Sequence, residues 1–102
     1  MPYFFFKLIP PRPTFPADIT PAEAGLMQQH VGYWRGWMEK GHVVAFGPVA
    51  DPKGTFGIGI IRLDEGADFQ SVAANDPVVA AGVGFRCEIH PMPSLVLPEA
   101  GA

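Results

Sequence analysis

Two side chains in this sequence could carry acid–base chemistry together, a histidine and an aspartate. His30 falls four residues before Trp34 and three after Met27, inside the apolar stripe of a predicted helix. Asp76 is the single ionisable side chain in residues 69–85, a run made mainly of small and apolar residues. A histidine on the buried side of a helix needs a partner for a ring nitrogen. An aspartate in that place would hold the imidazole in one tautomer and make it a stronger base, which suits general acid or base catalysis near neutral pH.

A structural interpretation of the same two residues stays open. A histidine in a core can pair with an aspartate at a helix end only to satisfy its own hydrogen-bonding atoms. Asp76 precedes Pro77, so its carboxylate could also bond to the backbone of a turn. The residue types alone do not separate a catalytic pair from a structural one.

Other residues near the pair could shape a substrate pocket. Tyr33 and Trp34 follow the histidine by about one helical turn and offer aromatic walls, although packing in the core explains them equally well. Arg12 lies in a loop that leads into the same helix and could hold a bound anion, with a solvated loop arginine as the alternative. We expect the Gly47-Pro48 turn to shape the pocket as well.

No cofactor and no metal ion is predicted. His30, His42 and His90 are the only histidines, and no two of them stand at the spacing of metal ligands. The glycines of "GIG", residues 57–59, lack the third glycine of a dinucleotide-binding loop. We expect them to clear one face of a strand for close packing of a helix, with approach of a ligand as the alternative. The single cysteine, Cys87, fits an inert core thiol in a reducing compartment.

Composition indicates one domain, residues 1–102, which is enough chain for one core. Only 17% of the residues are charged while 48% are hydrophobic, so we expect part of the surface to be buried in a homodimer or higher homo-oligomer. A net charge of −3 with seven scattered Lys and Arg provides no basic patch for nucleic acid. The apolar start contains Lys7 and is interrupted by prolines, so we expect no membrane span, no signal peptide and a cytoplasmic location.

The elements that would position the pair are visible in the sequence. A run rich in aromatic residues that ends at Pro10 predicts a strand over residues 3–9, followed by an extended, proline-rich loop over 10–20. Thr20, Pro21 and Glu23 form a capping box with a first-turn proline, so a helix should begin there and end near Gly41.

The second half of the chain repeats this pattern of strand and helix. Strands are predicted over 42–49 and 56–63, joined by the turn "DPKGT", and a final strand over 83–91. Between them, a short helix should end near Asp76, because a proline disfavours helical geometry in the residue before it. Residues 91–102 are predicted to form a C-terminal arm or tail.

The order of elements predicts an α+β, ferredoxin-like βαββαβ fold, a four-stranded antiparallel sheet with both helices on one face. Side-by-side helices can bring His30, midway along the first, to Asp76 at the end of the second. The opposite face would carry Phe5 and Ile9 with an apolar row from each remaining strand. Two such faces packed together would form a dimeric α/β barrel.

The segments 28–61 and 74–92 together resemble the YCII-related family. The matching features are His30, Gly47-Pro48 with the following Asp51, Asp76-Pro77, and Ala81-Gly82. The resemblance implies a dimeric α+β barrel in which His30 and Asp76 form an acid–base pair. One characterised branch of the family eliminates chloride from a chlorinated hydroxyhydroquinone, and the same barrel hosts muconolactone isomerases. The proline-rich loop of this chain is longer than in the short family members.

Two functions therefore follow as expectations. The first is a cofactor-free enzyme that uses His30 and Asp76 for elimination or isomerisation of a small oxygenated molecule, aromatic ones included. The second is a non-catalytic dimeric module that binds a small ligand or a protein partner, with the same pair as a structural hydrogen bond.

Overall fold

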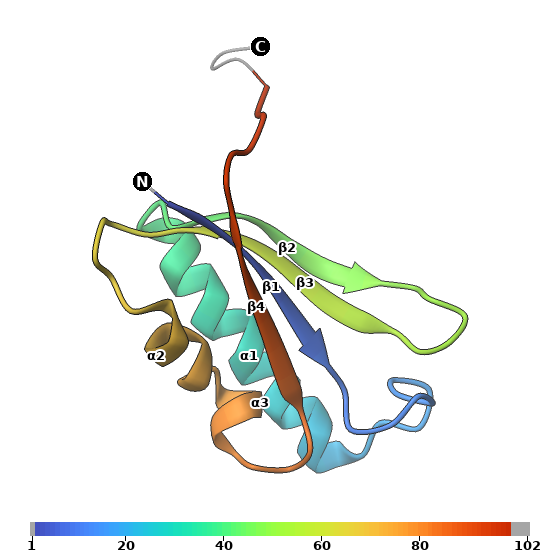
Figure 1. Cartoon of the computed structure of the whole chain (residues 1–102). Coiled ribbons are helices and arrows are strands. Elements are labelled where there is room, and N and C mark those ends of the chain that lie inside the picture. Colours follow the sequence, from blue (N-terminus) through green and yellow to red (C-terminus); the bar gives the residue numbers. More distant parts are fainter. Residues whose placement is uncertain (1, 99–102) are drawn as a thin grey trace.

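Residues 2–98 are described by a computed structural model, and they form the predicted α+β fold. The elements are β1 (Tyr3–Ile9), α1 (Pro21–Glu39), β2 (Val43–Val49), β3 (Phe56–Arg62), α2 (Phe69–Ala74), α3 (Pro77–Ala80) and β4 (Arg86–Met92). The four strands form one sheet in the order β2-β3-β1-β4. Every pairing between neighbours is antiparallel, and the helices cover one face of the sheet (Figure 1). This is the ferredoxin-like arrangement predicted from the sequence.

Helix α1 begins and ends as the sequence predicts. The Thr20 hydroxyl accepts the backbone N–H of Glu23, and the Glu23 carboxylate accepts the backbone N–H of Thr20. These two bonds satisfy N–H groups that a helix start otherwise leaves unpaired. At the other end Gly41 has a φ of 84°, a conformation that glycine adopts without strain.

The core lies between α1 and the central strands. Trp34 of α1 is 2% exposed, and its ring centroid lies 5.1 Å from that of Phe6 on β1. Phe69 of α2 packs against Phe4 on the same side of β1 at 5.0 Å. Burying large aromatic side chains in this way supplies much of the stability of a small domain. The same packing fixes the buried face of α1, and therefore the direction in which His30 points.

The segment after α2 differs from the sequence prediction, because a second short helix follows the first. Pro77 does stop α2, but it also stands at the first position of α3, where its missing N–H costs nothing. The carboxylate of Asp76 caps α3 by accepting the backbone N–H of Val78 at 3.1 Å. The predicted turn bond of Asp76 to its own backbone is therefore present.

Strand β4 also begins and ends later than predicted. Gly82 and Gly84 have φ angles of 67° and 104° and turn the chain, so the strand begins at Arg86 rather than at residue 83. At its other end Met92 still pairs with Tyr3 of β1. The predicted tail is therefore wrong at residues 91–92, and residues 99–102 of that prediction lie outside the described part of the chain. Both edge strands of the sheet contain a proline, Pro48 in β2 and Pro91 in β4.

The proline-rich loop is folded into turns rather than extended. Three backbone bonds, from Phe15 to Arg12, from Ala17 to Thr14 and from Ile19 to Pro16, connect residues three apart. The extended prediction failed because these turns are stabilised by burial of Phe15, which is 5% exposed. Only its contact with distant parts of the chain makes that burial possible.

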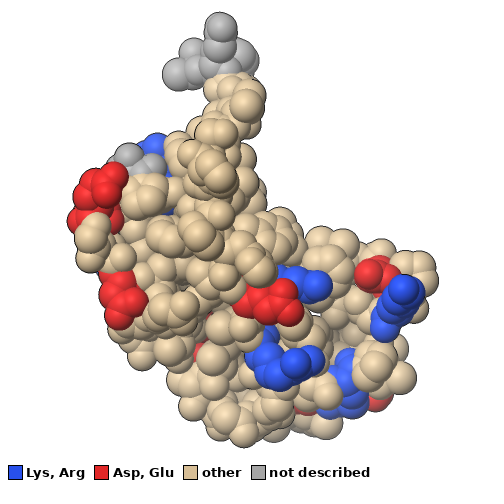
Figure 2. All heavy atoms as spheres, in the orientation of Figure 1, with Lys and Arg blue, Asp and Glu red and all other residues tan. Residues whose placement is uncertain are grey.

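The sheet face opposite the helices is apolar only in its centre. The register between β1 and β3 places Ile60 beside Phe5 and Ile58 beside Lys7 on that face. In the orientation of Figure 1, with β4 in front, most of the surface is uncharged, and acidic and basic side chains stand on it in separate groups (Figure 2).

On β4, however, the residues beside Phe5 and Lys7 are His90 and Glu88, both exposed. The apolar row of β4, Cys87 and Ile89, packs against the core instead. The prediction of an apolar outer row from every strand is therefore wrong for β4. Packing of two such faces in a dimer stays a prediction.

Candidate active site

His30 and Asp76 meet in the structure although 46 residues separate them in the sequence. The Nδ1 atom of His30 lies 2.7 Å from the Oδ2 atom of Asp76. Helix α1 supplies the histidine near its middle, and the junction between α2 and α3 supplies the aspartate. The predicted juxtaposition of the two side chains is therefore present.

The carboxylate of Asp76 has further hydrogen-bond donors. Trp34 donates its indole Nε1–H to the same Oδ2 atom at 2.7 Å, and the backbone N–H of Val78 donates to Oδ1. Asp76 is 0% exposed, so these bonds replace all of its contact with water. The side chain is thus both the partner of His30 and a fixed point that joins α1 to α3.

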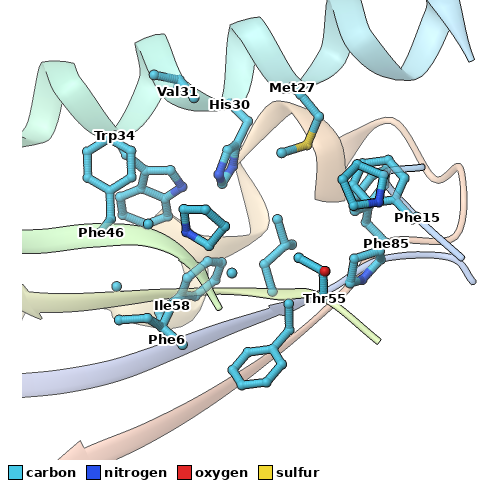
Figure 3. A pocket seen from close by; sticks show the side chains of 18 of the residues that line it. Phe6, Phe15, Met27, His30, Val31, Trp34, Phe46, Thr55, Ile58 and Phe85 are labelled. Atoms are coloured by element: carbon cyan, nitrogen blue, oxygen red, sulfur yellow. The ribbon is translucent and has the colours of Figure 1, made fainter. Parts of the chain in front are cut away.

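These contacts determine which nitrogen of His30 carries a proton. A carboxylate only accepts hydrogen bonds, so Nδ1 of His30 must donate its hydrogen to Asp76. The lone pair of the neutral ring is then on Nε2. Among the described residues no side chain or backbone group bonds to Nε2. The ring projects from α1 into an open space between the helix and the sheet (Figure 3).

That space is a cavity of about 330 Å³. Its size is at the lower end of the range for small-molecule sites, roughly 300–1,000 Å³. The walls are aromatic and aliphatic side chains together with glycine and proline. The lining residues are Phe6, Leu8, Pro10, Phe15, Pro16, Ile19, Met27, His30, Val31, Trp34, Phe46, Gly47, Pro48, Thr55, Phe56, Gly57, Ile58, Gly59, Ile61 and Phe85.

Among the described residues, the cavity wall contains no charged side chain while His30 is neutral. Protonation of His30 would place one positive charge there. The other polar side chain on the wall is that of Thr55. An ion moved from water into such surroundings loses its hydration without gaining a counter-ion. The arrangement therefore suits a neutral, largely apolar molecule with one group that interacts with the imidazole.

The residues predicted to shape the pocket separate into two groups. Trp34, Gly47 and Pro48 line the cavity. Tyr33 does not; its hydroxyl donates to the backbone carbonyl of Val72 at 2.6 Å, and burial raises the pKa of that hydroxyl. Adjacent residues on a helix point about 100° apart, and here Trp34 points toward the cavity while Tyr33 points toward α2.

Arg12 also lies away from the cavity wall. Its guanidinium forms a two-pronged ion pair with Glu23, with both N···O distances 2.7 Å. It therefore pairs with a carboxylate rather than facing a ligand in the cavity, although its side chain stays 31% exposed. The predicted role in holding an anion has no support in this geometry.

Two glycines of β3, already singled out in the sequence, have surroundings other than those expected. Gly57 and Gly59 line the cavity, and the atoms nearest to a Cβ built at either position belong to the sheet itself, to Leu8 and Ile61. The expected close contact with a helix is therefore wrong, and the two glycines instead leave room for the cavity. The spacing "GIG" was the available signal. Phe15 and Phe85 offered no comparable signal, because they meet across 70 residues.

The remaining candidate features have ordinary surroundings. Among residues 2–98 no three His, Cys, Asp or Glu side chains gather in a group able to hold a metal ion. His42 bonds to the backbone carbonyl of Arg62, away from the cavity. Cys87 is half-buried, and that burial raises the pKa of its thiol, which makes it a poor nucleophile. Within the same residues no helix is long and apolar enough to cross a membrane.

Comparison with known proteins identifies a family and a fold. The sequence pattern of the YCII-related domain matches residues 4–93. A protein of unknown function from Nitrosomonas europaea has a similar structure, with a TM-score of 0.53, 16% identity, and coverage of 96% of this chain and 95% of that one. A formyltetrahydrofolate deformylase from Pseudomonas putida is 13% identical with a TM-score of 0.44, over 88% of this chain but only 28% of its own. No curated protein matches the sequence.

Proposed function

The chain belongs to the YCII-related domain family, and from this premise we propose that it is a cofactor-free enzyme in which His30 moves a proton on a small molecule. The observation that carries the proposal is the orientation of the imidazole. Its Nδ1 atom is held by a buried carboxylate at 2.7 Å, while Nε2 is free to meet a ligand in the cavity. This is the arrangement that a general base requires.

In the proposed reaction the lone pair of Nε2 takes a proton from the substrate. The electrons of the broken bond stay on the substrate, and the new positive charge of the imidazolium lies against the carboxylate of Asp76. Return of the proton to a different atom completes an isomerisation. Departure of an anionic leaving group completes an elimination. His30 is the catalytic residue in this scheme, and Asp76 is a positioning residue.

The cavity wall supports a neutral substrate with an apolar framework. Because no Lys or Arg side chain reaches the described wall, a phosphorylated or multiply charged substrate would have no counter-charge. A planar ring suits the aromatic walls supplied by Phe6, Trp34 and Phe46. A C–H bond next to a carbonyl, or a phenol O–H, is the kind of acidic group that a histidine can deprotonate.

Hydrogen exchange on a model ketone tests the proposal without knowledge of the natural substrate. In D₂O the protein should speed the exchange of the acidic C–H hydrogens of 2-tetralone, a neutral bicyclic ketone, as followed by NMR. His30→Gln should lower this catalysed exchange by about 10²–10⁴-fold, the usual contribution of a general base. His90→Gln is the matched control, because His90 is exposed on β4 and should leave the rate unchanged. Equal exchange by wild type and His30→Gln would refute His30 as the base.

The alternative, a non-catalytic binding module, has one observation in its favour. Asp76 joins α1 to α3 through Trp34 and Val78, which is a structural task independent of catalysis. A module of this kind would bind 2-tetralone, as seen by calorimetric titration, with no exchange above that of the buffer. Stability measurements on Asp76 variants do not separate the two functions, because the aspartate is structural in both. Hydrogen exchange of 2-tetralone in D₂O separates them.

We also propose that the protein is a homodimer that packs the central outer face of the sheet against its copy. The support is the half-buried apolar group formed by Phe5, Ile58 and Ile60 on that face. Sedimentation equilibrium should give twice the chain mass of 11.0 kDa. Ile60→Glu should give the single mass, whereas Val83→Glu, at a site 46% exposed on another part of the surface, should not. A wild-type protein of single mass would exclude the dimer.

A further inference from the structure

The proline-rich loop provides one end of the cavity. Phe15, Pro16 and Ile19 of this loop line the wall. The ring of Phe15 meets that of Phe85 edge to face, with centroids 5.4 Å apart. In Figure 3 this pair of rings stands at the end of the cavity opposite Trp34, with His30 between the two ends. A molecule whose polar group meets His30 can therefore extend along this part of the cavity as far as the Phe15–Phe85 pair.

Arg12 fastens this loop to helix α1. Two nitrogens of its guanidinium bond to the two carboxylate oxygens of Glu23, each at 2.7 Å. The same side chain bonds to Asp18 through the backbone carbonyl and through the carboxylate, both at 2.9 Å. A planar guanidinium suits such multiple contacts, whereas a lysine would offer a single charged point. The start and the end of the loop are thus tied together and to the helix.

The Arg12–Glu23 pair keeps its charge over a wide pH range. The guanidinium of Arg12, followed by the backbone N–H of Thr20, lowers the pKa of Glu23 from 4.5 to about 2. A hydrogen bond to Arg12 also lowers the pKa of Asp18. Both carboxylates therefore stay ionised at any pH where the protein would normally work, and the loop remains tied.

The proline-rich loop also packs closely against two turns of the rest of the domain, at Gly54 and at Gly84. A Cβ built at Gly84 would lie 2.9 Å from the Cβ of Pro11, closer than real side chains approach. A Cβ at Gly54 would lie 3.4 Å from the Cα of Pro13. Both glycines have positive φ angles, 104° and 145°, so the backbone there is shaped for glycine as well. Ion pairs on the outside and close packing on both sides hold Phe15 in one place.

We propose that Phe15 is the residue that determines the length of molecule accepted in the cavity, and that Arg12 positions it. The inference rests on the proposed function only for the polar end of the ligand, where His30 would meet a hydroxyl or carbonyl group. Phe15 limits the apolar end in either case. The loop is thus an end wall with a defined position rather than a connection that happens to pass the site.

A series of 4-alkylphenols, from 4-methylphenol upward, measures the length limit by calorimetric titration. Each added methylene that is buried should tighten binding about fourfold until the chain reaches the end wall, and further methylenes should weaken it. Phe15→Ala should move the tightest-binding phenol to a longer chain. Phe15→Leu, a milder change that keeps most of the packing with Phe85, should move it by less. An optimum that stays in place in both variants would overturn the proposal.

Arg12→Gln tests the positioning role separately. Without the Arg12 contacts the loop can move, so Phe15 can shift to make room for a longer chain. Beyond the optimum length, the affinity for phenols should therefore fall less steeply than it does in wild type. Arg35→Gln removes the same charge from an exposed position on α1 and is the matched control, which should leave the series unchanged. An Arg12→Gln series identical to that of wild type would exclude Arg12 from positioning Phe15.

Alkylbenzenes distinguish a failure of this inference from a failure of the proposed function. They lack the hydroxyl group, so their binding does not depend on His30. If phenols bind no better than alkylbenzenes and ketone exchange is absent, the acid–base proposal fails, yet the length optimum and its shift in Phe15→Ala should persist. If the optimum does not shift for either series, the end-wall proposal fails whatever the role of His30.

Discussion

Asp76→Asn is expected to abolish most of the exchange chemistry while the protein stays folded. Trp34 and His30 both donate to Oδ2, so the amide should keep its one oxygen there and the ring should keep its hydrogen on Nδ1. A neutral amide, however, gives no negative charge to stabilise the imidazolium that forms when Nε2 takes a proton. The rate should therefore fall toward the loss of about 10²–10⁴-fold that removal of a general base causes. Exchange of 2-tetralone in D₂O measures the effect.

Asp76→Ala should instead unfold the protein more easily. Three donors, from His30, Trp34 and Val78, lose their acceptor in a place without access to water. Each buried donor left unpaired costs about 1–3 kcal/mol, so the three together should lower the free energy of unfolding by at least about 3 kcal/mol, which urea denaturation can measure. Asp68→Ala is the matched control, since Asp68 caps α2 in the same way but is exposed. Its expected loss is about 0.5–2 kcal/mol. Equal losses would contradict a special role for Asp76.

Trp34→Ala is expected to have the second-largest effect, a loss of about 3–5 kcal/mol in the free energy of unfolding. The indole is 2% exposed and packs against Phe6 and Phe69. Its removal also opens the wall of the cavity beside His30. Trp37→Ala, three residues along the same helix and only half-buried, should cost clearly less. Urea unfolding of the two variants side by side measures the difference.

Trp34→Phe separates the hydrogen bond of the indole from its volume. A phenyl ring keeps most of the packing but removes the Nε1–H that now donates to Asp76. The loss should be about 1–3 kcal/mol, the cost of a buried polar atom with one partner missing. A loss near zero would mean that the bond from His30 alone satisfies the Oδ2 atom.

The elements of the fold were predictable where the signal is local. Three such signals depend only on neighbours in the sequence: the capping box at Thr20 and Glu23, the glycine at position 41 and the aromatic-rich run at 3–9. Their order was enough to predict the topology, and the topology was enough to bring His30 to Asp76. Long-range information entered through the general rule that both helices cover one face and through the resemblance to the YCII-related family.

The parts that could not be predicted depend on contacts between distant segments. Pro77 could be interpreted only as the end of a helix, although it also begins one. The turns of the proline-rich loop are stabilised by the contact of Phe15 with Phe85, and no spacing in the sequence predicts that contact. Glu23 was recognised as a capping residue, but its pairing with Arg12 depends on the path of the loop. For the same reason, the full set of residues that line the cavity could not be predicted from the sequence.

The two prolines at the margins of the sheet restrict how copies of this chain can join. Pro48 in β2 and Pro91 in β4 each lack the N–H that an incoming strand would need, and these are the two outermost strands. Continuous sheets running from molecule to molecule, the route toward fibrils, are therefore blocked on both flanks. At high concentration the protein should stay in discrete assemblies rather than polymerise.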